Sequence, residues 1–266
     1  MKLLLLSDLH GRTDWYAWVR SQKADVTAIA GDLLDAFHPS GLLTQMISIK
    51  GWVDEFEAAL ALCSGNQDFN IEGGAVSGGK IDLTDGVDTE EARGLILADH
   101  WMDLLERENV VTDRRSQLLK SSDGQLVVTT LPYDFGDKCS KYIESLWEQG
   151  SALREASGSP WLVLHHEPPR ATLVGGQMGS GAATRMIRKY QPDWVLSGHL
   201  HRQPYKGSFS DQIGRSWCFN PGSPEGKSLE TDIPNHIVLD TKVGIATWYA
   251  GDGFRKEEIH RRIRLG

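Results

Sequence analysis

The 266-residue sequence has little cysteine, no long apolar run and no excess of positive charge. Its three cysteines, Cys63, Cys139 and Cys218, are too few and too widely spaced for a disulfide framework, which favours a reducing compartment. The apolar run at residues 3–6 is shorter than the roughly 7–15 residues of a signal-peptide core or the roughly 20 of a membrane span. We therefore expect a cytoplasmic protein with no membrane partner.

The charge balance argues against one class of partner. Asp and Glu number 36 against 28 Lys and Arg, which gives a formal net charge of −8. A protein that binds nucleic acid regardless of its sequence needs a basic surface, so large nucleic acid is not an expected partner. Taken alone, the same charge looks unfavourable for a protein that handles phosphate esters.

Short apolar runs alternate with longer helical patterns along most of the chain, which predicts an α/β architecture. The predicted strands are 2–6, 26–30, 59–64, 126–131, 161–165 and 193–197. The predicted helices lie near 13–22, 41–58, 89–108, 137–156 and 181–190. Past residue 214 we expect strands alone, at 215–219, 235–240 and 243–250, with the last two forming a hairpin around Lys242–Gly244. The charged segment 254–264 is interpreted as a solvated helix or strand end.

Five short polar segments each follow a predicted strand directly. They are Asp8-Leu-His10, Gly31-Asp32, Gly65-Asn66, His165-His166 and Gly198-His199-Leu-His201. Ligands of α/β sheets gather at the carboxyl ends of strands, so these side chains are expected to converge although they are far apart in sequence. Each segment alone has an ordinary interpretation as a turn, a helix cap or a buried histidine. The whole series, always placed after a strand, predicts one site.

The residue types in these segments indicate a metal centre. Carboxylates and neutral imidazoles suit divalent transition metals, and the lack of cysteine ligands argues against a closed structural zinc site. Seven ligands exceed the needs of one four-coordinate ion, but with one shared carboxylate they supply two ions with four ligands each. Two such ions clamp the oxygens of an in-line phosphoryl displacement, in which a bridging hydroxide is the nucleophile. Mn, Fe, Zn, Co and Ni all fit this mixture of donors.

The order Asp-x-His, Gly-Asp-x-x-Asp, Gly-Asn, His and Gly-His-x-His resembles the calcineurin-like metallophosphoesterase superfamily. The motifs span residues 8 to 201, and Asn220-Pro-Gly-Ser223 is similar to a segment of the small phosphodiesterases in that superfamily. The resemblance implies a four-layer αββα sandwich, an α/β fold in which helices flank two mixed β-sheets. We accordingly expect one metallophosphoesterase domain over residues 1–266, with a glycine-rich insertion loop at 70–88.

The resemblance also implies which residues bind each of the two divalent ions. One ion would be held by Asp8, His10, Asp32 and His201, and the other by Asp32, Asn66, His165 and His199. Asp32 would bridge the two ions. The choice between His165 and His166 stays open, because neighbours on a strand point to opposite faces. The superfamily pattern favours His165.

One position departs from the superfamily pattern. Most members have a His after Gly-Asn that protonates the leaving group or binds a phosphoryl oxygen, whereas this chain has Gln67. A carboxamide donates a hydrogen bond but cannot act as a general acid near pH 7. Asp35, which supports that His in the pattern, loses its usual partner. His166 and His38 lie beside motif residues and are candidates for supplying the proton.

The sequence therefore predicts a metal-dependent phosphoesterase for a small phosphate-ester substrate. The substrate class would be a phosphodiester or an activated phosphomonoester, because members without this His resemble phosphodiesterases. The residues expected nearest the chemistry are Asp32, Asn66, Gln67 and His166. The alternatives are a binding scaffold with weakened catalysis and a nuclease for short nucleic acid. A second glycine-rich segment, 175–181, either starts a helix or lines the substrate cleft.

Overall fold

The computed structural model describes residues 1–36, 41–68, 75–76, 79–80, 100–133, 141–224, 233–252 and 257–265. His38, Cys139 and the first part of the helix expected at 89–108 lie outside these ranges. The same holds for most of the insertion loop expected at 70–88, of which only the short strands β4 (Ala75–Val76) and β5 (Gly79–Lys80) are described.

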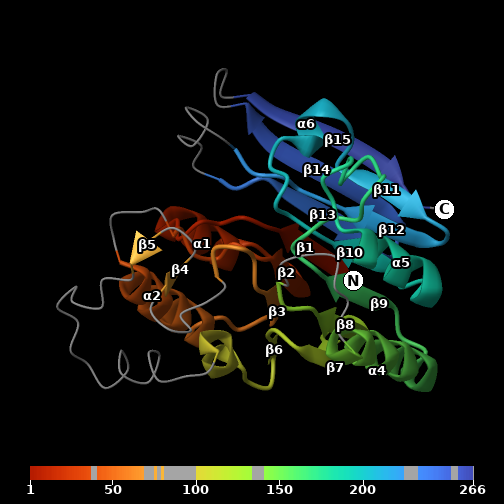
Figure 1. Cartoon of the computed structure of the whole chain (residues 1–266), viewed down its shortest axis with the longest axis horizontal. Coiled ribbons are helices and arrows are strands. Elements are labelled where there is room, and N and C mark those ends of the chain that lie inside the picture. The colour runs from red at the N-terminus through yellow and green to blue at the C-terminus, as the bar shows by residue number, and fades with distance from the viewer. Residues whose placement is uncertain are drawn as a thin grey trace.

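Seven strands form the first sheet, in the order β15-β14-β13-β1-β2-β3-β6 (Figure 1). In chain order they are β1 (Lys2–Leu6), β2 (Val26–Ala30), β3 (Ala59–Cys63), β6 (Val110–Val111), β13 (His236–Asp240), β14 (Ile245–Asp252) and β15 (Glu257–Arg264). Strands β1, β2, β3 and β6 are parallel, and β13, β14 and β15 continue the sheet with antiparallel pairing. The sheet is therefore mixed.

Six strands form the second sheet, in the order β11-β12-β10-β9-β8-β7. They are β7 (Arg115–Ser121), β8 (Gly124–Thr130), β9 (Trp161–Leu164), β10 (Trp194–Leu196), β11 (Ser210–Ile213) and β12 (Ser216–Phe219). Its centre, from β8 through β9 and β10 to β12, is parallel, and both edges are antiparallel.

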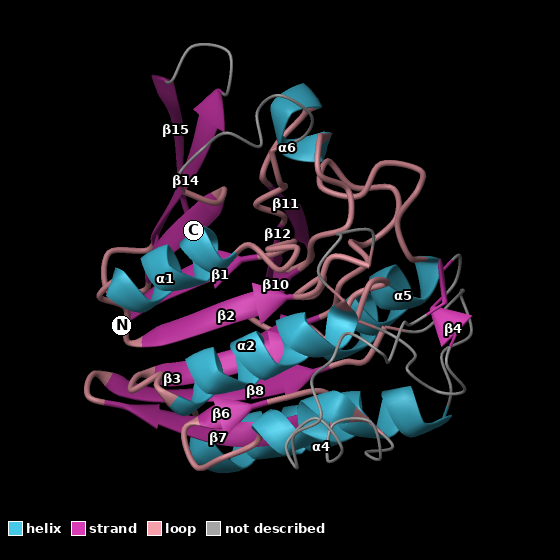
Figure 2. Cartoon of the chain, turned by 90° about the vertical axis from the view of Figure 1, so that its left-hand side faces the viewer, coloured by secondary structure: helices cyan, strands magenta, loops and turns pink. Residues whose placement is uncertain are grey.

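Helices cover the outer faces of the two sheets. They are α1 (Thr13–Ser21), α2 (Leu42–Asp54), the 3₁₀ helix η2 (Trp101–Leu105), α4 (Lys141–Ser157) and α5 (Gly181–Tyr190). The short α6 (Gln203–Lys206) instead packs Tyr205 against the core between the sheets. Figure 2 shows α1 and α2 lying across the face of the first sheet. Within the described residues, none of these helices combines the length and apolarity needed to cross a bilayer.

The alternation of side chains along each strand separates three layers of core. On β1, Leu3 and Leu5 belong to the core between the sheets, whereas Leu4 and Leu6 pack with residues of α1 and α2. The second sheet has the same arrangement, with one set of side chains facing the first sheet and the other facing α4 and α5. Because both faces of the central strands are buried, their sequences are continuous apolar runs. This is the predicted four-layer αββα sandwich, which is confirmed.

The predicted central strands agree with the observed ones to within about two residues, and the hairpin between β13 and β14 is confirmed. Strands β6, β7 and β11 were not predicted. The segment 254–264, interpreted as a solvated helix or strand end, contains β15, which pairs with β14 over eight residues. The helix expected at 41–58 ends at Asp54, because β3 already begins at Ala59.

Candidate metal centre

The five polar segments meet at one edge of the molecule, where parallel strands of both sheets end. Backbone hydrogen bonds continue the pairing past the strands and hold neighbouring segments together. The Asp8 N–H donates to the carbonyl oxygen of Gly31 at 2.9 Å, and the Gly198 N–H donates to that of His166 at 2.9 Å. The loops that carry the polar side chains are thus extensions of the two sheets. The expected convergence is what the structure shows.

Four side chains form a first cluster, defined by Asp8, His10, Asp32 and His201. One ligand atom from each lies within 4.8 Å of the others. The Nε2 atom of His201 is 3.1 Å from Oδ1 of Asp8 and 3.4 Å from Nε2 of His10. Two carboxylates and two imidazole nitrogens at such distances form a donor set that suits a divalent transition metal.

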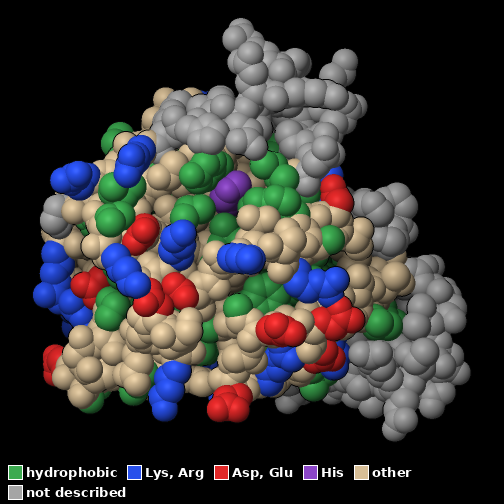
Figure 3. All heavy atoms as spheres, turned by 180° about the vertical axis from the view of Figure 1, so that it is seen from behind, with side chains coloured by type: hydrophobic (Ala, Val, Ile, Leu, Met, Phe, Trp, Pro, Cys, Tyr) green, Lys and Arg blue, Asp and Glu red, His purple; other side chains and the backbone are tan. Residues whose placement is uncertain are grey.

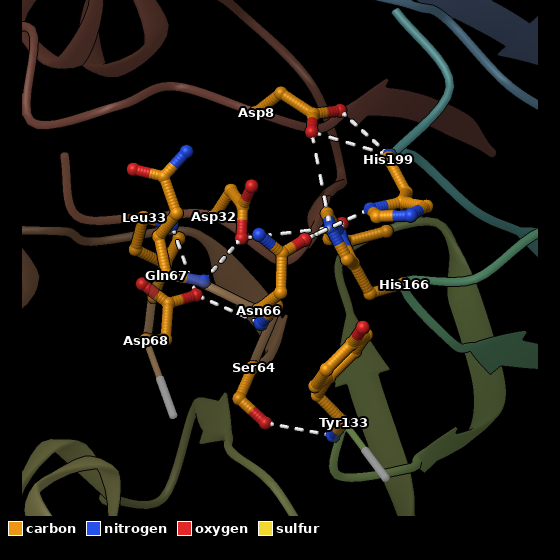
Figure 4. Close-up of polar contacts among 12 residues, drawn as sticks. Asp8, Asp32, Leu33, Ser64, Asn66, Gln67, Asp68, Tyr133, His166 and His199 are labelled. Carbon is orange, nitrogen blue, oxygen red and sulfur yellow. Dashed lines mark hydrogen bonds and ion pairs between the residues drawn. The ribbon is translucent and has the colours of Figure 1, made fainter. Parts of the chain in front are cut away.

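A second cluster consists of Asp32, Asn66, His166 and His199 (Figure 4). The Oδ1 atom of Asn66 is 2.8 Å from Nδ1 of His199 and 3.1 Å from Nε2 of His166. The same His166 nitrogen is 3.5 Å from Oδ1 of Asp32. The carboxylate of Asp32 therefore lies at the junction of the two clusters.

The hydrogen bond on the far side of the His166 ring fixes its tautomer. Its Nδ1 is 2.8 Å from the carbonyl oxygen of Ala30, which can only accept, so Nδ1 carries the proton. In the neutral form of that tautomer, Nε2 presents a lone pair towards the amide oxygen of Asn66. A cation bound by both atoms, which are 3.1 Å apart, would satisfy this arrangement.

The structure brings His166 rather than His165 into this cluster, which reverses the preference taken from the superfamily pattern. His166 is fully buried among the site residues. The Nδ1 atom of His165 instead contacts the carbonyl oxygen of Glu167 at 2.8 Å. The reason is strand alternation, because Leu162 and Leu164 face the other sheet and residue 166 follows the same parity.

Four of the clustered residues have an unusual backbone conformation. The φ angles of Asp8, His10, Asp32 and His199 are +56°, +49°, +50° and +64°. Residues other than glycine rarely adopt this left-handed region, and such strain persists where the surrounding structure holds it in place. The backbone turns sharply at these four positions and directs their side chains into the site.

Glycines in the motifs leave space for side chains from neighbouring strands. A Cβ atom on Gly65 would lie 2.2 Å from Oδ1 of Asp32, and one on Gly198 would lie 2.4 Å from Oδ2 of Asp8. Both distances are shorter than any side chain tolerates. Glycine precedes Asn66 and His199 because a carboxylate oxygen from the first sheet lies against the backbone at each of these two glycines.

Burial and neighbouring charges control the ionisation of the site. Burial acts to raise the pKa of Asp8, but His201, His166 and His10 outweigh it and hold that pKa below its ordinary value. For Asp32, burial and the charge of Asp8 raise the pKa to about 7. Burial is also the main cause that lowers the pKa of His199 to about 4, followed by His166, so this imidazole is neutral and able to act as a ligand at pH 7.

Asp68 has a structural role that its place in the motif did not reveal. Its buried carboxylate accepts hydrogen bonds from the backbone N–H groups of Leu33, Leu34 and Gly65, at 3.0, 2.8 and 2.9 Å. Asp68 thereby joins the loop after β2 to the loop after β3. The only sequence signal was an Asp three residues after a glycine turn, which is typical of a local side-chain-to-backbone bond.

Gln67 is anchored by both its backbone and its side chain. Its N–H donates to Oδ1 of Asp32 at 2.8 Å, and its Oε1 accepts from the N–H of Ala36 at 2.9 Å. Since a backbone N–H can only donate, the carboxamide oxygen must face Ala36. The backbone of Asp35 is bound by Gln45, whose Oε1 accepts from the Asp35 N–H and whose Nε2 donates to the Asp35 carbonyl.

Two further segments contact the site. The Nδ2 atom of Asn220 donates to the carbonyl oxygens of Val174 and Leu200, and the Ser223 hydroxyl donates to the carbonyl of Asp8, each at 3.3 Å. The Asn-Pro-Gly-Ser segment thus supports the loops that carry the ligands. In the glycine-rich segment 175–181, the Ser180 side chain caps α5, which confirms that this segment starts a helix.

Comparisons with known proteins support the resemblance. The family model for calcineurin-like phosphoesterases matches residues 1–203, a range that contains all nine residues proposed for the site. A search of curated proteins finds no match. Among solved structures, the protein TT1561 of Thermus thermophilus is similar, with 15% identity, a TM-score of 0.55 and 99% of both chains covered.

Two other solved structures are similar at lower scores. A dimetal phosphatase from Danio rerio has 11% identity and a TM-score of 0.49, with 100% of this chain and 99% of the other covered. Vps29 from Entamoeba histolytica, complexed with Zn²⁺, has 10% identity and a TM-score of 0.42, with 100% of both covered. At these identities, likeness to a solved structure shows the fold alone, so the membership rests on the family match. The chain belongs to the calcineurin-like phosphoesterase family.

Proposed function

We propose that this protein hydrolyses a small phosphodiester, or a phosphomonoester with a good leaving group, with two divalent metal ions. The observation that carries this proposal is the position of the Asp32 carboxylate between two convergent donor sets. Asp8, His10, Asp32 and His201 would hold one ion. Asp32, Asn66, His166 and His199 would hold the other, with His166 in the place first given to His165.

The donor sets suit that chemistry. When bound, a pair of such ions polarises the phosphoryl group and lowers the pKa of bound water. The chain has the task of holding and orienting the ligands. Asp32 supplies one carboxylate to both positions, the neutral amide of Asn66 adds no further negative charge, and His199 is neutral at pH 7. The bond from His166 Nδ1 to the Ala30 carbonyl keeps Nε2 directed into the site.

The preference for diesters and good leaving groups follows from Gln67. Its carboxamide cannot transfer a proton to a departing alkoxide near neutral pH. A general acid typically contributes about 10²–10⁴-fold to a rate, and a substrate whose leaving group needs no proton loses least without one. We therefore propose aryl or otherwise activated esters as the best substrates in vitro.

Metal analysis combined with hydrolysis of bis(4-nitrophenyl) phosphate tests the function. We expect about two equivalents of divalent metal per chain, hydrolysis that a chelator stops, and loss of both metals in Asp32→Ala. Retention of two full equivalents in that variant would refute the bridging role of Asp32. A fully loaded wild-type protein that hydrolyses no ester would refute the enzyme and favour the scaffold.

The charge distribution supports a small substrate over a nucleic acid. On the face shown in Figure 3, Lys and Arg side chains are interspersed with Asp and Glu rather than gathered in one stripe. DNA binding that weakens steeply with salt would contradict this choice and favour the nuclease. We also propose a cytoplasmic location, because the two described cysteines, Cys63 and Cys218, are free thiols.

A further inference from the structure

A sixth strand end reaches the metal centre, and it carries Tyr133. This residue follows β8, which lies beside β9 in the second sheet. Its N–H donates to Oγ of Ser64 at 2.9 Å, and the N–H of Leu131 donates to the carbonyl oxygen of Leu164 at 2.9 Å. The backbone at Tyr133 is thereby tied to the ends of both β3 and β9, the two strands that present Asn66 and His166.

The side chain of Tyr133 packs against the imidazoles of the second cluster. Its ring centroid is 5.8 Å from that of His166 in an edge-to-face arrangement and 6.3 Å from that of His199. Only 5% of the residue is exposed. In Figure 4 the hydroxyl group is at the end of the ring that is directed towards Asn66 and His166.

The chemistry of this side chain suits hydrogen-bond donation. A phenol keeps its proton throughout the neutral range and is a hydrogen-bond donor there. It can therefore donate to an anionic oxygen without giving up its proton.

We propose that the Tyr133 hydroxyl donates a hydrogen bond to a non-bridging oxygen of the substrate's phosphoryl group beside the second cluster. This inference rests on the proposed function and assigns a substrate-binding residue to it. The side chain of Gln67 is bound through Oε1 to the N–H of Ala36, which leaves its NH2 group as a second donor. Tyr133 would add a phenol donor from the second sheet.

The test is Tyr133→Phe in the metal-loaded protein, which removes the hydroxyl and keeps the ring against both imidazoles. We expect kcat/KM for bis(4-nitrophenyl) phosphate to fall by about 10- to 100-fold, because a donor to developing negative charge is lost. Inorganic phosphate, measured by calorimetry, should bind about 5- to 10-fold more weakly. Metal content should stay at the wild-type value. Tyr142→Phe is the matched control, because Tyr142 is 49% exposed on α4.

Three results would overturn the inference. The first is a kcat/KM and a phosphate affinity that both stay within twofold of wild type. The second is a loss of metal from Tyr133→Phe, which would give the residue a role in holding ligands instead. The third is an equal effect of Tyr142→Phe. If wild-type protein binds metal and phosphate but hydrolyses no diester, the proposed function fails, and the phosphate measurement still decides the role of Tyr133.

Discussion

The first sheet brings mainly oxygen donors to the candidate metal centre, whereas the second sheet brings imidazoles. Asp8, Asp32 and Asn66 follow strands of the first sheet, with His10 as the exception. His166, His199 and His201 follow strands of the second. The first half concentrates buried carboxylates, and the second half supplies imidazole nitrogens that contact them.

The pKa shifts reflect this division. Within the first sheet, the charge of Asp8 adds to burial in raising the pKa of Asp32. Across the sheets, His201 and His166 lower the pKa of Asp8. Docking of the two sheets therefore stabilises the buried carboxylates, and bound metal would complete the neutralisation. Metal binding at a site built across an interface in this way would be coupled to the packing of the sandwich.

The contribution of the second sheet is removed most directly by His166→Ala. We expect this variant to keep one equivalent of metal and to lose at least about 100-fold in kcat/KM for bis(4-nitrophenyl) phosphate, because the second cluster loses a ligand. His165→Ala, the neighbour on the opposite face, should keep both metals and stay within about threefold. Metal analysis and steady-state kinetics check both variants, and the reverse result would restore His165 as the ligand.

The repulsion within the first sheet is tested by Asp32→Asn in metal-free protein. The folded pKa of Asp32, about 7, lies above the ordinary 3.8, so the folded state holds a proton that the unfolded state has lost. The stability contributed by this group is thus present below about pH 4 and is lost as the pH rises towards 7. Asp32→Asn has no charge at position 32, so its free energy of unfolding near pH 8 should exceed that of the wild type by about 1–2 kcal/mol.

Thermal unfolding in the presence of a chelator measures this effect. A gain of about 2–8 °C in Tm at pH 8, shrinking towards pH 5, is the expected result. Asp54→Asn on the half-exposed face of α2 is the control and should show no such trend. A destabilised Asp32→Asn at pH 8 would contradict the account of charge repulsion.

The smallest expected effect belongs to Gln67→His, which adds an imidazole to the side of the site supplied by the first sheet. Turnover of a phosphomonoester with an alkyl leaving group should rise by about 3- to 10-fold, with less change for the aryl diester. Gln67→Ala, which removes the carboxamide without adding a proton donor, should show no such selectivity. Equal rates for both substrates in both variants would show that proton donation at position 67 does not limit hydrolysis.

The convergence of the candidate ligands was predictable because they follow continuous apolar runs. Asp8 and Asp32 come directly after strands buried on both faces, so their placement at one sheet edge follows from topology alone. The same apolar continuity explains the uncertainty at His165 and His166. Trp161 and Val163 face the helices while Leu162 and Leu164 face the other sheet, yet all four are equally apolar, so the sequence does not reveal which face is which.

Other residues escaped prediction because their roles depend on tertiary contacts. Tyr133 follows Leu131-Pro132 without a recognisable motif, and the pairing of β8 with β9 in the second sheet puts its ring beside His166. The contacts of Asp68 with Leu33 and Leu34 join loops about 35 residues apart. Strand β15 is rich in charged residues and resembles a solvated segment, which an edge strand with a single partner tolerates.

The position of β1 in the first sheet has a consequence during synthesis. Its residues pair on one side with β2, made shortly afterwards, and on the other side with β13, about 230 residues later in the chain. At typical translation rates of about 5–20 residues per second, the second edge of this leucine-rich strand waits roughly 10–50 s for its partner. An unpaired apolar edge is an aggregation hazard, so β1 carries that hazard until β13 has been made.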